Sequence, residues 1–280
     1  MRPTPGGWVD LINKVARDAG ATVGMAFTSA EQGHRRFSRP GLPDEPVLSE
    51  LFDRMRGYFA AHGTLGRLGE PGSERGLARL CWILAAFQYA YRNDSIEHPL
   101  FRVFRDDVPS VEELHRSADD EAIADPLALV HRLNTSGALQ QMRRLVGDPP
   151  VGTPWGTTGP VIFDQWDDST FVLDGPGSAT LLDVVALVKA DDSHSRGRRR
   201  IWKLLACAWL DTADTFRIRT VSVYFARHGE LVTWPVASLS ELVLEDRDPQ
   251  EARNEFVGLA TCLRGKDRAR RAAWRAGRDQ

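Results

Sequence analysis

Cysteines and long apolar runs are both scarce in this sequence. Its 280 residues include three cysteines, an odd number without the close pairing of a structural zinc site. We expect Cys81, Cys207 and Cys262 to be buried, reduced thiols. No run approaches the ~18 apolar residues that a membrane span requires, and the N-terminus lacks the apolar core of a signal peptide. These absences predict a cytoplasmic protein that makes no contact with a membrane.

Familiar catalytic motifs are missing as well. The sequence contains no HExxH motif, no P-loop and no GxSxG motif, and its seven histidines are scattered. We therefore do not expect the zinc, nucleotide or serine-hydrolase chemistry that these motifs support.

The formal net charge is only −2, but the charges are unevenly distributed. Acidic residues outnumber basic ones between Asp44 and Asp125, a stretch without lysine. The segments RGRRR (196–200) and LRGKDRARRAAWRAGRDQ (263–280) are strongly basic. Such clusters either contact an anionic partner such as nucleic acid or form a solvated, disordered tail. The acidic half would repel a duplex, which favours a protein partner for that half.

Helical periodicity dominates the first half of the chain. Apolar residues three and four apart predict helices over 9–19 and 46–62, the second ended by Gly63. Residues 73–94 form the most apolar predicted helix, with Ser73 as its N-cap. This pattern predicts a helical bundle with that helix at its centre.

The character of the sequence changes after two or three shorter helices predicted within 110–147, where Pro126 breaks the run. A Pro/Gly/Thr-rich loop follows at 148–160. The predicted elements beyond it are strands at 160–166, 169–174 and 179–190, a helix at 198–214, two strands within 217–239 around a turn at 227–230, and a helix at 248–265. This order predicts a mixed sheet of an α/β type.

One carboxylate interrupts the apolar strand SATLLDVVALVKADD. Asp183 stands in its middle, and a buried carboxylate is costly unless something pairs with it. The hairpin before it places Asp183 opposite Thr170 and Asp168 opposite Val185, so the two aspartates share a face as diagonal neighbours, ~7–8 Å apart. Mg²⁺ or Mn²⁺ suits such a pair of oxygen ligands. Alternatively, Asp168 belongs to an exposed loop and Asp183 accepts hydrogen bonds from a helix end.

The order GPVIFD…DDSTFVLDG…ATLLDVVA…RRIWKLLACAWLD…RIRTVSVYFARHGELVTWPV resembles the nuclease core of the PD-(D/E)XK, restriction-endonuclease-like superfamily. The resemblance covers most of residues 20–240 and implies an α/β fold: a restriction-endonuclease-like mixed sheet core with a largely helical N-terminal half. We expect a helical region at 1–150 that packs on the core, the core itself at 151–245, and a C-terminal helix with a basic tail at 246–280.

In that superfamily an Asp on one strand and an Asp/Glu-x-Lys motif on the next hold Mg²⁺. Carried over to this sequence, Asp168 and Asp183 would be the ligands, with the carbonyl of Val184 as a third. The lysine position falls on Val185, which departs from the motif. Either Lys203 on the following helix takes the role of that lysine, or the catalytic lysine has been lost and the site is inactive. In a further alternative, Lys203 faces solvent.

The resemblance implies metal-dependent phosphodiester hydrolysis of DNA or RNA, in phage defence or DNA processing, with Mg²⁺ or Mn²⁺ as cofactor. The alternative is a catalytically lapsed nuclease fold that binds nucleic acid or serves as a scaffold subunit; a small-molecule enzyme is a weaker option. Catalysis would rest on Asp168, Asp183 and Lys203. The residues expected to contact backbone phosphates are Arg196, Arg198, Arg199, Arg200, Arg268, Arg270, Arg271 and Arg275.

Overall fold

The computed structural model describes most of the chain from residue 45 onward. The described residues are 45–63, 68–93, 98–103, 109–150, 153–158, 162–163, 171–186 and 194–276. The helix predicted over 9–19 and the carboxylate Asp168 lie outside them. Within these ranges no helix is both long and apolar enough to cross a membrane.

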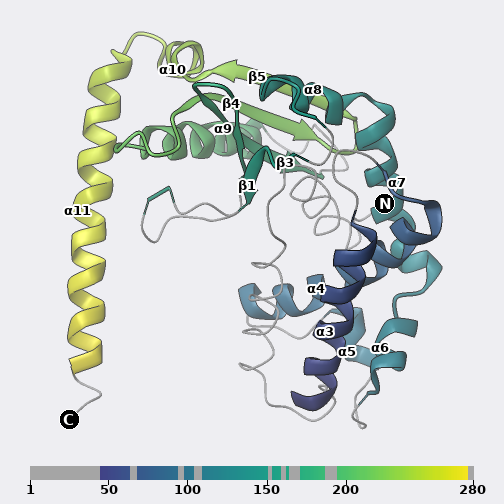
Figure 1. Ribbon diagram of the computed structural model, residues 1–280. Helices are drawn as coiled ribbons and strands as arrows, with labels where there is room; N and C mark the ends of the chain where they lie inside the picture. The colour runs from purple at the N-terminus through teal and green to yellow at the C-terminus, as the bar shows by residue number, and fades with distance from the viewer. Residues whose placement is uncertain are drawn as a thin grey trace.

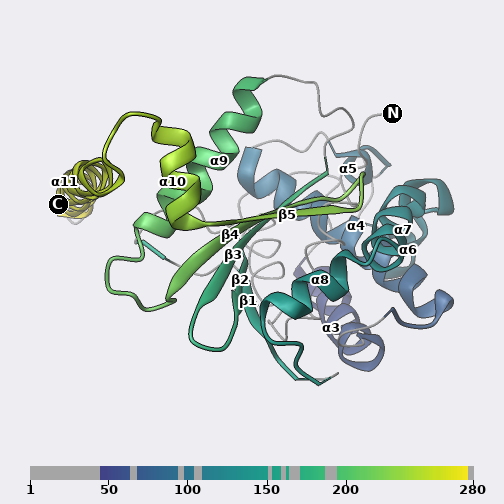
Figure 2. The same cartoon turned by 90° about the horizontal axis from the view of Figure 1, so that it is seen from above.

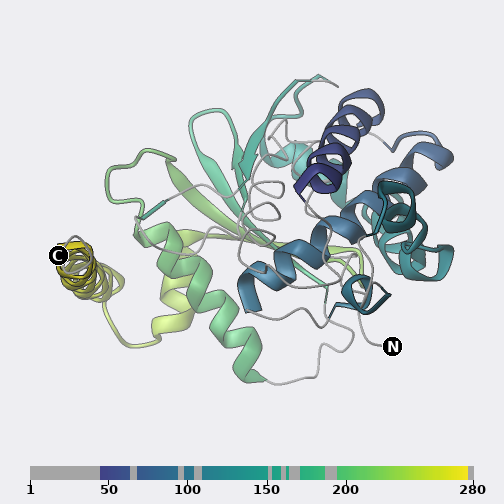
Figure 3. The same ribbon diagram turned by 90° about the horizontal axis from the view of Figure 1, so that it is seen from below.

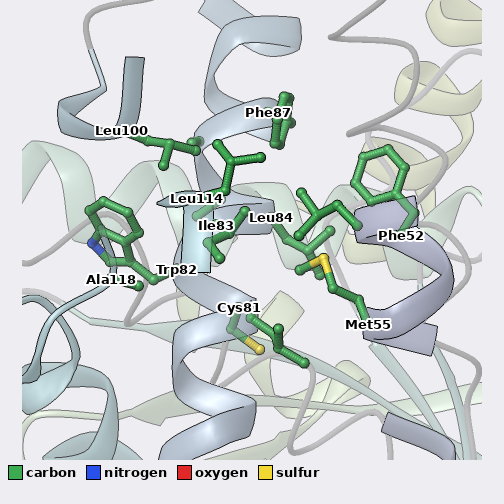
Figure 4. Close-up of a cluster of buried hydrophobic side chains, with 14 of the residues drawn as sticks. Phe52, Met55, Cys81, Trp82, Ile83, Leu84, Phe87, Leu100, Leu114 and Ala118 are labelled. Atoms are coloured by element: carbon green, nitrogen blue, oxygen red, sulfur yellow. The ribbon is translucent and has the colours of Figure 1, made fainter. Parts of the chain in front are cut away.

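Between residues 45 and 150 the described chain forms helices whose buried residues up to Ile123 share one apolar core, whereas those from Leu129 onward form a second core with the strands. These helices are α3 (Glu45–His62), α4 (Pro71–Asn93), α5 (Pro99–Val103), α6 (Val111–Arg116), α7 (Asp120–Thr135) and α8 (Ala138–Leu145). From Leu77 to Phe87, every residue of α4 except Arg79 is buried. Figure 4 shows this helix against Phe52 and Met55 of α3. The most apolar predicted helix therefore does lie at the centre of the bundle.

Polar side chains fix the start of two helices. Ser110 and Glu113 bond reciprocally at the start of α6, and Asp119 accepts the N–H of Ala122 at the start of α7. α7 then continues through Pro126, where the sequence predicted a break. The proline removes one helical hydrogen bond, but the buried apolar stripe of α7 holds the helix together.

The start of α4 also differs from the prediction. The helix begins at Pro71, which suits a first turn because its missing N–H would be unpaired there. Glu74 accepts the N–H of Gly69 at 2.7 Å, whereas Ser73 lies inside the first turn and contacts His62 at 3.3 Å. Ser73 is therefore not the N-cap.

The described strands form one five-stranded mixed sheet. In both chain order and spatial order they are β1 (Gly156–Thr158), β2 (Phe171–Asp174), β3 (Ala179–Val185), β4 (Ile218–Phe225) and β5 (Glu230–Pro235). β3 and β4 pair in parallel, and the other neighbours pair antiparallel. In the β2–β3 hairpin Phe171 lies opposite Leu182, which confirms the predicted register.

Helices cover both faces of the sheet, as Figure 2 shows. α9 (His194–Trp209) connects β3 to β4 and packs with α10 (Val236–Leu244) on the face that carries Val185. α7 and α8 cover the opposite face, which carries Val184, because successive strand side chains alternate. At the edge of the molecule stands α11 (Pro249–Ala276) (Figure 1). The fold is thus α/β with a mixed sheet, as predicted.

The structure differs from the predictions at three segments of the sheet. β1 lies inside the segment 148–160, which was predicted to be a loop; Thr157 and Thr158 favour a strand and pair with β2 there. Of the strand predicted at 160–166, only residues 162–163 are described; they form a bend, and the prediction for the other residues stays a prediction. β5 ends at Pro235, and the following residues form α10 instead of extending the strand.

α11 is longer than predicted. It runs to Ala276, so most of the predicted basic tail is helical. Cys262 is exposed on this helix, although Cys81 and Cys207 are buried as expected. The prediction fails for Cys262 because α11 packs against the body with only one of its sides.

Two arginines bond the helical half to the turn between β4 and β5. Arg227, in the β4–β5 turn, donates from Nη1 and Nη2 to the two carboxylate oxygens of Asp125 on α7, each at 2.7 Å. Its Nε donates to the carbonyl oxygen of Ala186 at 3.3 Å. Arg132 on α7 donates to the carbonyl oxygen of Arg227 at 2.8 Å. The turn is therefore bound to α7 and to the end of β3 at once.

Replacing Gly229 in this turn with alanine is expected to lower the free energy of unfolding by about 2 kcal/mol. Gly229 has a φ of +72°, and a Cβ there would lie 2.7 Å from the Cβ of Ser136. Urea unfolding measures the loss. Gly177→Ala is the matched control, because Gly177 has a φ of +82° with open space around it. It should cost only about 1 kcal/mol, and equal losses would contradict the close approach.

Candidate functional site

Asp183 lies in the middle of β3, on the sheet face that α9 covers. Its side chain is 7% exposed. Its neighbours Leu182 and Val184 point to the opposite face, into the core beneath α7 and α8. Val223 of β4 lies beside it in the parallel pair. The sheet and α9 therefore enclose this carboxylate, and it is buried as the sequence predicted.

Arg200 of α9 is the partner of this carboxylate. Its Nη1 donates to Oδ2 of Asp183 at 2.9 Å. Burial raises the pKa of Asp183 above its ordinary value, and the charge and hydrogen bond of Arg200 oppose that rise. Because burial has the larger influence, the native carboxyl holds a proton more tightly than it would in the unfolded chain.

Lys203 adds a second positive charge one turn further along α9. Its charge also acts to lower the pKa of Asp183, with a smaller effect than Arg200. The side chain is half-buried, while Leu204 and Leu205 form part of the buried side of the helix. Lys203 therefore lies close enough to influence the Asp183 carboxylate from the helix while its side chain stays partly exposed to solvent.

Val185 is the residue on which the sequence resemblance places the motif lysine. It is buried in an apolar cluster formed by β2, β3, β4, α9 and α10. That position is therefore part of the hydrophobic core. It contributes no cation to the site, so the positive charges near Asp183 come from α9 alone among the residues that the structure describes.

A magnesium site needs several oxygen ligands, and the described residues do not assemble them. Over the described ranges no three His, Cys, Asp or Glu side chains gather where they could hold a metal ion. Oδ2 of Asp183 accepts a hydrogen bond from Nη1 of Arg200 at 2.9 Å, so the oxygen that a metal ion would need is already bonded to a cation. Asp168, the other predicted carboxylate ligand, lies outside the described residues. The described residues around Asp183 and Val184 therefore do not fit Mg²⁺ or Mn²⁺.

The arginines predicted to contact phosphates fall into two separate groups. Arg198 and Arg199 are exposed on α9, beside Arg200. Arg268 and Arg270 are exposed on the C-terminal half of α11. Figure 3 shows that the N-terminal end of α9 points away from α11. The other three arginines of this prediction have side chains that the structure does not describe; they are Arg196, Arg271 and Arg275.

Sequence reasoning assigned Arg200 to phosphate binding and missed its bond to Asp183. One alternative did contain the signal, because it had Asp183 accept hydrogen bonds from a helix end. Arg200 lies in the N-terminal half of α9, and Arg200, Lys203 and Leu204 share one side of that helix by their spacing. The buried carboxylate is therefore satisfied by the helix that crosses over β3.

Comparisons with protein-family models, with curated proteins and with solved structures found no match to this chain.

Proposed function

We propose that this chain is a catalytically lapsed nuclease fold that binds the backbone of nucleic acid through exposed arginines of α9. Its elements follow the order strand–strand–strand–helix–strand–strand, with helices before them. The resemblance to the restriction-endonuclease-like superfamily rests on the same kind of order, although its first strand was placed at 160–166 and β1 lies at 156–158. The mixed sheet with a helical N-terminal half supports the same relationship.

The observation that carries this function is the pair between Asp183 and Arg200. In an active site of this superfamily the second-strand carboxylate holds a metal ion and a lysine two residues later assists. Here the carboxylate is neutralised by a guanidinium at 2.9 Å, and Val185 is part of the apolar core. The bond to Arg200 makes the buried carboxylate part of the packing of α9 on the sheet. The site then lacks both the metal-binding carboxylate and the lysine of the motif.

Arg198 and Arg199 supply the binding surface. Both are exposed, and the first turn of α9 contains no acidic residue. Cations near a helix N-terminus are unfavourable by a few tenths of a kcal/mol each, because the helix dipole is positive there. Both guanidinium groups are available to an anion, and phosphate contacts of this kind bind without reading sequence.

Metal-dependent hydrolysis of DNA or RNA is the second candidate. The observation in its favour is the charge of Lys203, which acts on Asp183 from the helix where a displaced motif lysine is expected. This candidate needs Asp168 as well, which lies outside the described residues. The two candidate functions differ in one measurable outcome. The bound nucleic-acid strand stays intact if the fold has lapsed and is cleaved if the site is active.

Fluorescence anisotropy with labelled single- and double-stranded 20-mers of DNA and RNA tests the proposed function. We expect the wild type to bind with a strong salt dependence. The double variant Arg198→Glu/Arg199→Glu should bind about tenfold more weakly or worse, with a salt slope reduced by about two. The matched control is Arg116→Glu/Arg144→Glu, which makes the same charge change at exposed positions of the helical half.

The same samples are incubated with Mg²⁺ or Mn²⁺ and then resolved on a denaturing gel. Intact strands together with α9-dependent binding support the lapsed fold. Cleavage that disappears in both Asp183→Ala and Lys203→Ala supports the hydrolase instead. Binding that is absent, or equally weakened by the control variant, would overturn a role for α9.

A further inference from the structure

One side of α11 is exposed and apolar at its centre. The helix has 28 residues, which gives a length of about 42 Å. Ala252 and Ala260 are buried against the body, and the ring of Phe256 packs at a tilt beside that of Trp209 of α9, with 6.0 Å between the ring centroids. Figure 1 shows the helix standing along the edge of the molecule, with its C-terminal half extending beyond the sheet. That half of the helix packs little against the rest of the described chain.

Large apolar side chains remain uncovered on this helix. Leu259 is 59% exposed and Leu263 is 51% exposed, and Cys262 between them is exposed as well. The three residues lie on one side of α11, because they are three and four positions apart. Leucines at such positions in an otherwise polar helix are typical of a helix–helix contact.

The charges on the same side change sign along the helix. Glu251 and Glu255 precede the apolar centre, and Lys266 and Arg270 follow it. All four are exposed. Together with Leu259, Cys262 and Leu263 they occupy roughly one third of the helix circumference. We call these seven residues the α11 seam. The seam is acidic at one end, apolar in the middle and basic at the other end.

We propose that the α11 seam binds the α11 seam of a second copy of this chain, with the two helices antiparallel. An antiparallel pair places the acidic end of each seam against the basic end of its partner. Leu259 then packs on Cys262 of the partner, Glu255 faces Lys266, and Glu251 faces Arg270. In each pair the two residues lie equally far along the helix from the same point, midway between Ala260 and Thr261. The seam is therefore complementary to itself, as a twofold interface requires.

A second copy fits this surface better than nucleic acid does. A polyanion would be attracted to Lys266 and Arg270 but repelled by Glu251 and Glu255, and it would leave the leucines uncovered. The exposed ion pairs that now involve seam residues, Glu255 with Arg247 at 2.8 Å and Arg270 with Asp267 at 3.0 Å, are weak enough to rearrange. The dimer does not depend on the function proposed above.

Sedimentation equilibrium of the full chain tests the dimer. The wild type at tens of micromolar should show twice the monomer mass of 31.2 kDa. Leu259→Asp should weaken the association at least 100-fold. Thr261→Asp is the matched control, because Thr261 is exposed on the opposite side of α11; it should leave the dimer intact. A monomeric wild type, or a dimer that survives Leu259→Asp, would overturn the interface.

Charge exchange tests the antiparallel register. Glu251→Lys/Glu255→Lys should dissociate the dimer, because both ends of the seam become basic. Adding Lys266→Glu/Arg270→Glu to the same chain should restore the dimer, since every facing pair is again opposite in sign. Failure of this rescue in a folded protein would contradict the register.

Cys262 provides a direct readout of proximity. It lies near the twofold axis of the proposed pair, and the other two cysteines are buried. A short bismaleimide should therefore give a covalent dimer of the wild type and no covalent dimer of Cys262→Ser. A wild type that stays uncrosslinked while it sediments as a dimer would place the contact elsewhere.

Discussion

Replacing Arg227 with alanine is expected to lower the free energy of unfolding by about 3 kcal/mol. The side chains of Arg227 and Asp125 are only 17% and 11% exposed. Removal of Arg227 takes both of its hydrogen bonds from the buried Asp125 carboxylate, and breaking a buried pair typically costs about 3–5 kcal/mol. The same substitution also removes the bond from Arg227 to the carbonyl of Ala186. Urea unfolding followed by tryptophan fluorescence measures the change.

The chain contains a natural control for this prediction. Arg219 makes the same two-bond contact with Asp214, with both distances at 2.7 Å. Those side chains are 57% and 52% exposed, so solvent screens the pair. Arg219→Ala should cost no more than about 1 kcal/mol. Equal losses of unfolding free energy for Arg219→Ala and Arg227→Ala would contradict the prediction. They would show that burial does not decide how much the Arg227–Asp125 pair contributes to stability.

The second large effect is expected from Arg200→Ala. This substitution removes the bonded guanidinium from the buried Asp183 carboxylate beneath α9. It should lower the free energy of unfolding by about 3 kcal/mol at neutral pH. The lower end of the usual range applies because the Arg200 side chain is 36% exposed. Arg199→Ala, its exposed neighbour, should change the stability by less than about 0.5 kcal/mol. The double variant Asp183→Asn/Arg200→Ala should lose less than Arg200→Ala alone, since no buried charge remains.

The cost of Arg200→Ala should also depend on pH. Burial already raises the pKa of Asp183 above its ordinary value of 3.8, so stability due to this group is full below that value and falls as the pH rises through the native pKa. Arg200 acts to lower that pKa, and its removal raises the pKa further. The difference between wild type and variant should therefore be small near pH 4 and largest at neutral pH. A difference that is constant across this range would contradict a charged pair in the native protein.

The sheet was largely predictable from the sequence because strand signals are local. Alternation and turn residues placed β2 and β3 in the register that the structure shows, with Phe171 opposite Leu182. β1 was not predictable in the same way, since its three residues Gly156–Thr158 lie within a segment rich in Pro and Gly and pair with β2 over only three positions. α10 was missed because VASLSELVL follows a strand directly and is apolar on most sides.

The candidate site was predictable only in part. The burial of Asp183 follows from the apolar residues on both sides of it in the sequence. The identity of its partner does not follow from the sequence, because Arg198, Arg199 and Arg200 are chemically equivalent. They differ only in which side of α9 they occupy. Packing of α9 on β3 turns Arg200 inward and leaves Arg198 and Arg199 exposed. That rotation of the helix is set by the tertiary contacts of Leu204 and other buried residues.

The most direct measurement is a single reaction in which a labelled single-stranded oligonucleotide is bound by the wild type in the presence of Mn²⁺ and then resolved on a denaturing gel. We expect the strand to be bound through Arg198 and Arg199 and to be recovered at full length, because Asp183 is bonded to Arg200. Shortened products that vanish in Asp183→Ala would contradict this, and would show that the carboxylate leaves its arginine to take part in hydrolysis.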